Sequence, residues 1–285
     1  MTIYESPAKV NLALLVQPPR PDGYHPIESL VQTIEWADEL VVEEAEEESV
    51  VIEGADIDPD DNLVVRALRA IRGLGSVPRL DIRLAKRIPT GAGLGGGSSN
   101  AAATLLAATE AGSLPASSAS VAAPTIGADV PLFLVGGTMM VSGIGEGVES
   151  LQPPLSGFAV AVAVPPFEMS TVEVYRRWDL MDGPVGEVID GRSLPPGLRD
   201  GMPIRNDLTP AAIDIEPTLA DFMADLRAQW GVPVAMTGSG SGCFGFFADS
   251  AEATDAAALV SSMCRGSTGA PLRSNGVSRR ASGEE

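Results

Sequence analysis

Residues 91–100 hold the best candidates for chemistry in this sequence, and they read Gly-Ala-Gly-Leu-Gly-Gly-Gly-Ser-Ser-Asn. Five of the first seven positions are glycine, so few side chains keep a bulky ligand away from the backbone N–H groups. Residues 100–112 follow with good helix formers and a closing glycine, which predicts a helix that starts where the loop ends. The unpaired N–H groups of that helix favour an anion, so the stretch predicts a phosphate-binding loop.

Two better-known glycine loops fit this stretch poorly. A P-loop ends in Gly-Lys followed by Ser or Thr, whereas Gly97-Ser98-Ser99 has no lysine. A dinucleotide-binding fold needs an acidic residue about 20 residues further on, with parallel strands after it. A flexible linker is the other alternative, but the strand-like residues 80–84 before the loop and the helix after it favour a structured phosphate site.

Lys9 and Lys86 are the lysines among 19 lysine and arginine residues. An arginine-rich chain that keeps lysine at two places either needs a compact ammonium there or keeps it by chance, and this observation leaves both open. Residues 5–17 read as a strand on which Lys9 and Asn11 share one face. The pair belongs either to a solvated edge or to the wall of a polar pocket.

Asp129 stands between Gly-Ala and Val-Pro, directly before an apolar run. A surface charge explains such a position poorly. The carboxylate is therefore either the N-cap of a helix or a catalytic group.

Residues 18–26 form a proline-rich loop with an Asp-Gly turn signal before Tyr24 and His25. A loop stiffened by proline presents side chains at low entropic cost, so Tyr24 and His25 are exposed candidates for ligand contact. An ordinary surface turn is the alternative.

Composition limits the class of protein. The chain has 285 residues, 45% of them hydrophobic, and can bury a large core. A formal charge of −19 argues against a nucleic-acid partner, because phosphate backbones require clustered Lys and Arg. The sequence has no apolar run long enough to span a membrane and no export signal, and it has two cysteines, so we expect a cytoplasmic protein.

Hydrophobic patterning predicts strands and helices along the whole chain. Residues 28–43 read as two strands and a turn, and residues 60–72 as a capped helix. Residues 158–164 are apolar throughout, which is typical of a strand buried on both faces. Ser170 and Glu173 form a capping-box pattern at the start of another helix.

Pro153-Pro154 separates two halves of the sequence. We expect an N-terminal domain over residues 1–152 that carries the glycine loop and a C-terminal domain over residues 153–270. Residues 271–285 are expected to be a disordered tail.

Six motifs stand out along the chain, namely Pro7-Ala-Lys9-Val-Asn11, Pro21-Asp-Gly-Tyr-His25, Gly93-Leu-Gly-Gly-Gly-Ser-Ser-Asn100, Gly127-Ala-Asp129-Val-Pro131, Asn206-Asp207-Leu208 and Thr237-Gly-Ser-Gly240. They occur in the order and approximate spacing that is found in the GHMP kinases, and the chain resembles that family from about residue 4 to 265. The resemblance implies an α+β fold of two domains, each a mostly antiparallel sheet packed with helices, with the active site in the cleft between them.

The resemblance also implies a reaction. The second and third motifs together are similar to the family members that use ATP to phosphorylate the 2-hydroxyl of 4-diphosphocytidyl-2-C-methyl-D-erythritol in the non-mevalonate isoprenoid pathway. Asp129 matches the position of the catalytic base, and Lys9 that of the ammonium beside it. A carboxylate within hydrogen-bond reach of the hydroxyl can take its proton, although a purely orienting Asp129 would give the same sequence. Mg²⁺ is the expected cofactor beside ATP, with Ser98 and Ser99 as the hydroxyls of the loop.

Two groups of binding residues follow from the resemblance. The nucleotide would be held by Asn62, Leu63, Lys86, Pro89, Gly91, Gly93, Leu94, Gly95, Gly96, Gly97, Ser98 and Ser99. The acceptor would be held by Asn11, Tyr24, His25, Thr171, Tyr175, Thr237 and Gly238, with Tyr24 and Tyr175 enclosing the cytosine. The implied protein is a monomer or homodimer whose partner is this small molecule, with neither nucleic acid nor membrane.

Three features of the sequence depart from the family pattern. Pro26 replaces a common acidic residue, Ser241-Gly242 replaces a more usual Pro-Thr, and Pro124 interrupts the helix expected before Gly127. Two rival functions stay open. Another GHMP kinase, of the mevalonate, homoserine or sugar type, would not need the cytosine contacts, and a non-catalytic sensor of a phosphorylated metabolite would not need Asp129.

Overall fold

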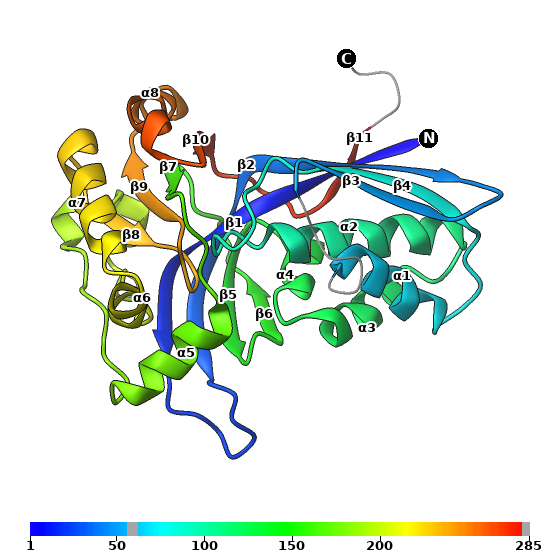
Figure 1. The fold of residues 1–285 in the computed structure, drawn as a ribbon, viewed down its shortest axis with the longest axis horizontal. Coiled ribbons are helices and arrows are strands. Elements are labelled where there is room, and N and C mark those ends of the chain that lie inside the picture. Colours follow the sequence, from blue (N-terminus) through cyan, green and yellow to red (C-terminus); the bar gives the residue numbers. More distant parts are fainter. Residues whose placement is uncertain (56–61, 281–285) are drawn as a thin grey trace.

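The computed structural model describes residues 1–55 and 62–280 and shows an α+β fold (Figure 1). Its strands are β1 (Thr2–Val16), β2 (Ile27–Glu44), β3 (Ser49–Glu53), β4 (Leu80–Ala85), β5 (Thr138–Gly143), β6 (Gly147–Ser150), β7 (Ala159–Val164), β8 (Val234–Met236), β9 (Cys243–Phe247), β10 (Gly266–Pro271) and β11 (Ser278–Arg280). Its α-helices are α1 (Leu63–Arg72), α2 (Gly96–Ala111), α3 (Ser117–Ile126), α4 (Val130–Val135), α5 (Thr171–Leu180), α6 (Thr209–Ile215), α7 (Thr218–Trp230) and α8 (Ser250–Val260).

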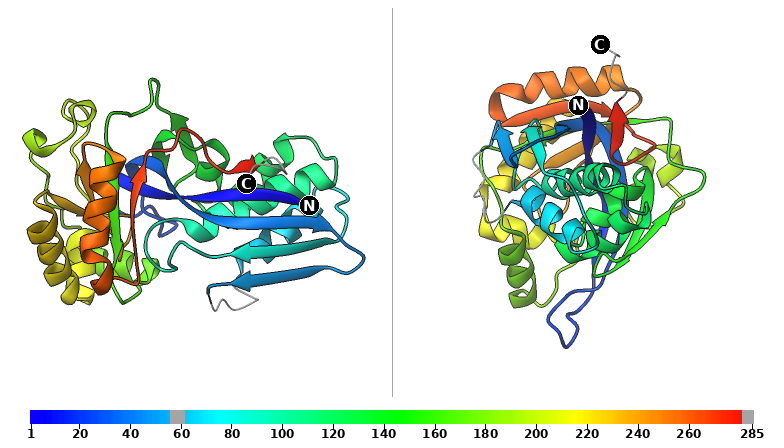
Figure 2. Two further views of the ribbon diagram at one scale, coloured as in Figure 1. Left: turned by 90° about the horizontal axis from the view of Figure 1, so that it is seen from above. Right: turned by 90° about the vertical axis from the view of Figure 1, so that its right-hand side faces the viewer.

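The strands form two sheets, and the long strands of the first sheet lie at the front in the view from above, with helices behind them (Figure 2). The first has the order β11-β1-β2-β4-β3, and β5 and β6 extend it along the other half of β2. The second has the order β10-β7-β9-β8. Among the described strands only β3 and β4 pair in parallel, so the expectation of mostly antiparallel sheets is confirmed.

Strand β7 shows how the layers pack, because both of its faces are buried. Its alanines face a core shared with helices α5 to α8, and its valines face a core shared with β1 and β2. A third core lies between the first sheet and helices α1 to α4. The apolar run over residues 158–164 predicted this double burial.

Strand β2 is one continuous strand of 18 residues, so the prediction of two strands and a turn over residues 28–43 is wrong. The register with β1 shifts between Pro7, which pairs with Ala37, and Ala8, which pairs with Ile34. The two residues between Ile34 and Ala37 are therefore extra residues at a β-bulge. The bulge breaks the alternation of side chains, which imitates a turn in the sequence.

Helix α2 begins at Gly96, four residues before the predicted start at Asn100. Its N-cap is Gly95 with a φ of 72°, and a Cβ at this residue would lie 2.7 Å from the ring of Phe133. Glycine is required here both by the left-handed backbone and by the close packing. The last glycines of the loop therefore supply the unpaired N–H groups of the first helical turn.

Pro124 does not interrupt the helix before Gly127, because α3 continues through it to Ile126. Proline removes one backbone hydrogen bond from a helix. Burial of Ala119, Ala122, Ala123 and Ile126 on one side of α3 offsets that loss.

The expectation of a disordered tail over residues 271–285 is wrong for the part that the structure describes. After β10 the chain returns to the first sheet, where β11 pairs with β1 (Figure 2). The side chain of Arg273 is 5% exposed and forms ion pairs with Glu5 and Glu35. Sequence statistics for polar chain ends do not register such long-range pairs.

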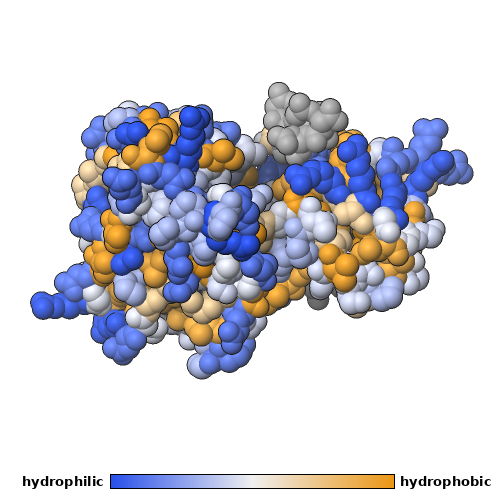
Figure 3. Space-filling view, turned by 90° about the horizontal axis from the view of Figure 1, so that it is seen from below, coloured by the Kyte–Doolittle hydropathy of each residue, from blue (hydrophilic) through white to orange (hydrophobic). Residues whose placement is uncertain are grey.

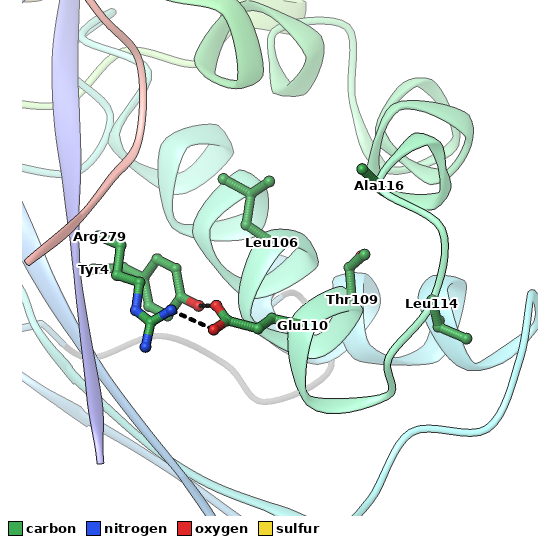
Figure 4. A pocket seen from close by; sticks show the side chains of 7 residues that line it. All are labelled: Tyr4, Leu106, Thr109, Glu110, Leu114, Ala116 and Arg279. Atoms are coloured by element: carbon green, nitrogen blue, oxygen red, sulfur yellow. Dashed lines mark hydrogen bonds and ion pairs between the residues drawn. The ribbon is translucent and has the colours of Figure 1, made fainter.

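A second contact joins this returning segment to helix α2 (Figure 4). Arg279 pairs with Glu110, and the hydroxyl of Tyr4 donates to the same carboxylate at 2.7 Å. Burial, and then the hydrogen bond with Glu110, raises the pKa of Tyr4, so the phenol stays a donor at neutral pH. The contact fixes the end of α2 that lies opposite to the glycine loop.

Hydrophilic side chains cover most of the face shown in Figure 3, with apolar ones between them. Within residues 1–55 and 62–280, none of the helices has both the length and the hydropathy that crossing a membrane requires.

Candidate active site

A cleft of about 1200 Å³ lies between the glycine loop, the start of α4 and helix α5. It is lined by most of the residues that the sequence singled out. These are Lys9, Asn11, Tyr24, His25, Leu63, Lys86, Pro89, Gly91, Gly93, Leu94, Gly95, Gly96, Gly97, Ser98, Asp129, Thr171, Tyr175 and Gly238. Segments that are far apart in the chain thus meet in one concave site, as enzyme sites commonly do.

Lys9 and Asp129 face each other in this cleft, with 3.6 Å between Nζ and Oδ2. The Lys9 side chain is 5% exposed, whereas that of Asp129 is 41% exposed. Asn11 accepts a hydrogen bond of 2.5 Å from the Lys9 ammonium, so the ammonium is held from two sides. The carboxylate of Asp129 keeps one side open toward the cleft, where it can meet a hydroxyl.

Asp129 occupies the N-cap position of α4, and among the described residues its side chain accepts no capping hydrogen bond. The two alternatives for Asp129, a helix N-cap position and a catalytic carboxylate, are therefore compatible. The backbone starts a helix at Asp129, while the carboxylate pairs with Lys9 and is available for chemistry.

The glycine loop is bonded to both sheets. The backbone N–H of Lys9 donates to the carbonyl of Leu94 at 2.9 Å, and the N–H of Gly242 donates to the carbonyl of Ala92 at 3.0 Å. A Cβ on Gly238 would lie 3.4 Å from the Lys9 ammonium, so this glycine packs beside the reaction centre. The loop, the ammonium and the turn after β8 therefore hold fixed positions relative to one another.

Lys86 is tied to a buried carboxylate that the sequence analysis did not single out. Its ammonium contacts Asp38 and donates to Asn100 at 3.0 Å, and the side chains of Lys86 and Asp38 are 3% and 0% exposed. Asp38 also accepts from the backbone N–H groups of Arg87 and Ile88 at 2.7 and 2.8 Å. This network fixes the chain before the glycine loop as well as the start of α2.

Neighbouring groups bury most of the His25 side chain, so the expectation of an exposed histidine is wrong. Its side chain is 6% exposed, its Nδ1 lies 3.1 Å from the carbonyl of Gln17, and its Nε2 lies 3.3 Å from Asp179. A carbonyl only accepts, so Nδ1 carries a hydrogen. The ring also packs 5.2 Å from that of Tyr175 and edge-on to Trp178.

The two tyrosines of the expected clamp differ in exposure. Tyr24 is 61% exposed at the rim of the cleft, while Tyr175 packs against His25. Burial, and then the nearby Asp129 carboxylate, raises the pKa of Tyr175, so its phenol keeps its hydrogen at neutral pH.

Three of the expected site residues do not line the cleft. Asn62 caps α1, where its side chain accepts from the N–H of Val64 at 2.9 Å. Ser99 is buried in the first turn of α2, and its hydroxyl has no hydrogen-bond partner among the described residues. The hydroxyl of Thr237 accepts from the N–H of Asn11 at 2.9 Å and supports the site from behind.

The cleft also contains charged residues that the sequence analysis missed, among them Glu146, Arg176 and Asp179. Arg176 forms none of the ion pairs found among the described residues, and it stands next to Tyr175 on the wall of the cleft. Its position beside an expected binding residue was the signal in the sequence. In a chain with a net charge of −19, such local cations are needed to meet an anionic ligand.

A polar clasp joins the start of the glycine loop to the second sheet. The Arg265 guanidinium contacts Glu168 at 2.7 Å and the carbonyl of Thr90 at 2.6 Å. The hydroxyl of Thr90 donates to Glu168 at 2.5 Å. This hydrogen bond, and then Arg265, holds the pKa of Glu168 below its usual range.

Carboxylates, histidines and cysteines do not form a cluster of three that suits a metal ion anywhere in the described part of the chain. The Ser98 hydroxyl and the open side of Asp129 are among the oxygen donors that line the cleft.

Comparison with known proteins identifies the family. Residues 62–137 match the family model described as GHMP kinases N terminal domain. The chain is 38% identical over 260 residues to the 4-diphosphocytidyl-2-C-methyl-D-erythritol kinase of Cereibacter sphaeroides, covering 88% of this chain and 91% of the relative. The chain belongs to the GHMP kinases. A protein of the same name from Pelotomaculum thermopropionicum is also 38% identical, over 265 residues and with the same two coverages.

Solved structures of GHMP kinases share the fold. A crystal structure of 4-(cytidine 5'-diphospho)-2C-methyl-D-erythritol kinase matches with a TM-score of 0.75 and 33% identity, covering 94% of this chain and 99% of that one. The homoserine kinase of Cytophaga hutchinsonii matches with a TM-score of 0.60 at 17% identity, covering 98% and 97%. This second likeness concerns the fold alone. The predicted family and fold class are confirmed.

Proposed function

We propose that this GHMP kinase transfers the γ-phosphoryl group of ATP to the 2-hydroxyl of 4-diphosphocytidyl-2-C-methyl-D-erythritol in the non-mevalonate isoprenoid pathway. The observation that carries the proposal is the 38% identity over about nine-tenths of the chain to kinases that bear this name. Two features of the cleft support phosphoryl transfer to an alcohol: the glycine loop at a helix N-terminus, and the lysine–aspartate pair.

Asp129 is proposed as the base. Its carboxylate opens to the cleft and already pairs with an ammonium, so it is placed to accept the proton of a hydroxyl bound between it and the glycine loop. Lys9 then stands beside the oxygen that gains negative charge as it attacks the γ-phosphorus. Phosphoryl transfer needs mainly such positioning and charge neutralisation.

The glycine loop and Lys86 are proposed to hold the ATP phosphates. Helix α2 offers the N–H groups of its first turn, and Asp38 with Asn100 keeps the Lys86 ammonium beneath that turn. Mg²⁺, brought with ATP, would neutralise charge on the phosphates, with the Ser98 hydroxyl as a protein oxygen near them.

Cytidine is proposed to bind beside Tyr175 and Tyr24. Tyr175 is fixed by its packing against His25, whereas the exposed Tyr24 is free to close over a base. Stacking on an aromatic ring contributes roughly 1–3 kcal/mol per base. Arg176 stands on the same wall and is the cation available to the diphosphate. Asn11, Thr171, Thr237 and Gly238 complete the proposed acceptor site.

A direct test follows the phosphorus atoms. The wild-type protein is incubated with ATP, Mg²⁺ and 4-diphosphocytidyl-2-C-methyl-D-erythritol, and products are followed by ³¹P NMR. The proposal expects ADP and a new phosphomonoester in equal amounts, with the diphosphate bridge of the acceptor intact. ADP formation without the phosphomonoester would contradict it.

A further inference from the structure

Ser29 lies behind the reaction centre, at a second bulge between β1 and β2. The register shifts between Asn11, which pairs with Val31, and Ala13, which pairs with Leu30, so Leu12 is the extra residue. Ser29 is fully buried, and its hydroxyl donates to the carbonyl of Ala13 at 2.6 Å. Bulges occur often beside active sites, where they re-aim a side chain.

The same hydroxyl also meets the side chain of Asn11, with 2.8 Å between Nδ2 and Oγ. A serine hydroxyl has a single hydrogen, and a backbone carbonyl can only accept. Because that hydrogen is used on Ala13, the Ser29 oxygen can only accept from its other neighbour. The NH₂ group of Asn11 must therefore face Ser29, which leaves the amide oxygen to face Lys9.

The other end of the amide agrees with this direction. The Lys9 ammonium has donors only, and it lies 2.5 Å from Oδ1 of Asn11. A continuous series of hydrogen bonds thus runs from the Lys9 ammonium through Asn11 and Ser29 to the Ala13 carbonyl. Thr237 does not set this direction, because its hydroxyl lies 3.4 Å from Oδ1 and can also donate to Gly93.

We infer that Ser29 is a positioning residue for phosphoryl transfer: it fixes the direction and place of the Asn11 amide, and through it the Lys9 ammonium beside Asp129. The inference rests on the proposed function for its kinetic readout. Ser29 does not itself line the cleft, and it reaches the reaction centre through Asn11, which does.

The test is a double-mutant cycle of Ser29→Ala and Asn11→Asp. In the wild-type background Ser29→Ala leaves a buried NH₂ group without an acceptor, and we expect kcat to fall about tenfold with KM for ATP unchanged. An aspartate at position 11 has two equivalent oxygens and no NH₂ group. Its side chain therefore needs no acceptor at Ser29 and has no reversed orientation. In the Asn11→Asp background the same Ser29→Ala change should therefore cost less than twofold.

A space-filling role for Ser29 predicts a different pattern, namely the same loss of kcat in both backgrounds. That result, or a wild-type kcat for Ser29→Ala, would overturn the inference. Ser29→Cys keeps the side-chain shape with a weaker hydrogen-bonding atom and should repeat the pattern at smaller size if Ser29→Ala does not fold.

NMR gives a readout that does not depend on turnover. The Asn11 side-chain NH₂ signals should exchange slowly with solvent in the wild-type protein and faster in Ser29→Ala. Unchanged exchange would contradict the role of Ser29. A third outcome separates the two claims. If the wild-type protein shows no turnover, but its Asn11 signals exchange slowly and those of Ser29→Ala exchange faster, the proposed function is contradicted and the role of Ser29 is not.

Discussion

The Lys9 ammonium on β1 lies 3.6 Å from the Asp129 carboxylate at the start of α4; both residues line the cleft, and the carboxylate is the more exposed of the two. The pair places a fixed positive charge beside a group that can take a proton. This arrangement suits the attack of an alcohol on a phosphoryl group.

Asp129→Asn should lower kcat by roughly 10²–10⁴, which is the usual effect of losing a general base. Steady-state kinetics with saturating ATP and acceptor measures it. The carboxylate is 41% exposed, so the thermal unfolding temperature should change little and serves as the control for folding. Turnover close to that of the wild type would remove Asp129 from the reaction.

Tyr175→Ala should raise KM for the cytidine diphosphate acceptor about tenfold, which corresponds to ~1.4 kcal/mol, while KM for ATP stays near the wild-type value. The reason is the loss of a ring on which cytosine would stack. Tyr175→Phe is the matched control and should keep both constants, because it keeps the ring. Equal weakening of ATP and acceptor would mean that Tyr175 supports the fold of the cleft instead.

His25 shows what the sequence could and could not predict about the site. Its motif placed it correctly at the cleft, but the sequence did not reveal that Gln17, Asp179 and Trp178 enclose its ring. Likewise, the glycine loop was evident from local composition. Partners that come from distant segments leave no local pattern, because tertiary packing alone brings them together.

The fold also has features that the sequence predicts and features that it does not. The strand β7 was predictable because double burial requires an unbroken apolar run. The continuity of β2 and the return of β11 to β1 were not predictable, because a bulge and a long-range strand pairing decide them. Asp38 was missed for a similar reason, since its partners lie in the segment before the glycine loop and in α2.

Lys86→Met should destabilise the protein by about 3–5 kcal/mol, because it leaves the Asp38 carboxylate buried without its cation. Urea unfolding measures the change. In the double variant with Asp38→Asn the buried charge is gone while an oxygen still accepts from Arg87 and Ile88, so part of the stability should return. A double variant that is as unstable as the sum of both single ones would contradict a buried ion pair.

Glu168→Gln should reveal a stabilisation that depends on pH. Its hydrogen bond from Thr90, and then Arg265, lowers the pKa of Glu168 in the folded protein, so ionised Glu168 stabilises the fold at neutral pH. That contribution is fully present above the ordinary pKa of a glutamate, and it is lost as the pH falls through the lower pKa of the folded state. The difference in Tm between wild type and Glu168→Gln should be small at pH 7, because the Glu168 side chain is 58% exposed, and should vanish in acid. A Tm difference between the two proteins that increases as the pH is lowered would contradict a stabilising role for ionised Glu168.

The acceptor preference tests the central claim most directly. The value of kcat/KM is measured at one saturating ATP concentration for 4-diphosphocytidyl-2-C-methyl-D-erythritol, mevalonate, homoserine and galactose. A site that uses a cytosine ring and a diphosphate should favour the first acceptor by at least 10³, which corresponds to ~4 kcal/mol of additional binding in the transition state. Comparable or higher kcat/KM for any of the other three would contradict the account and assign the cleft to a different alcohol.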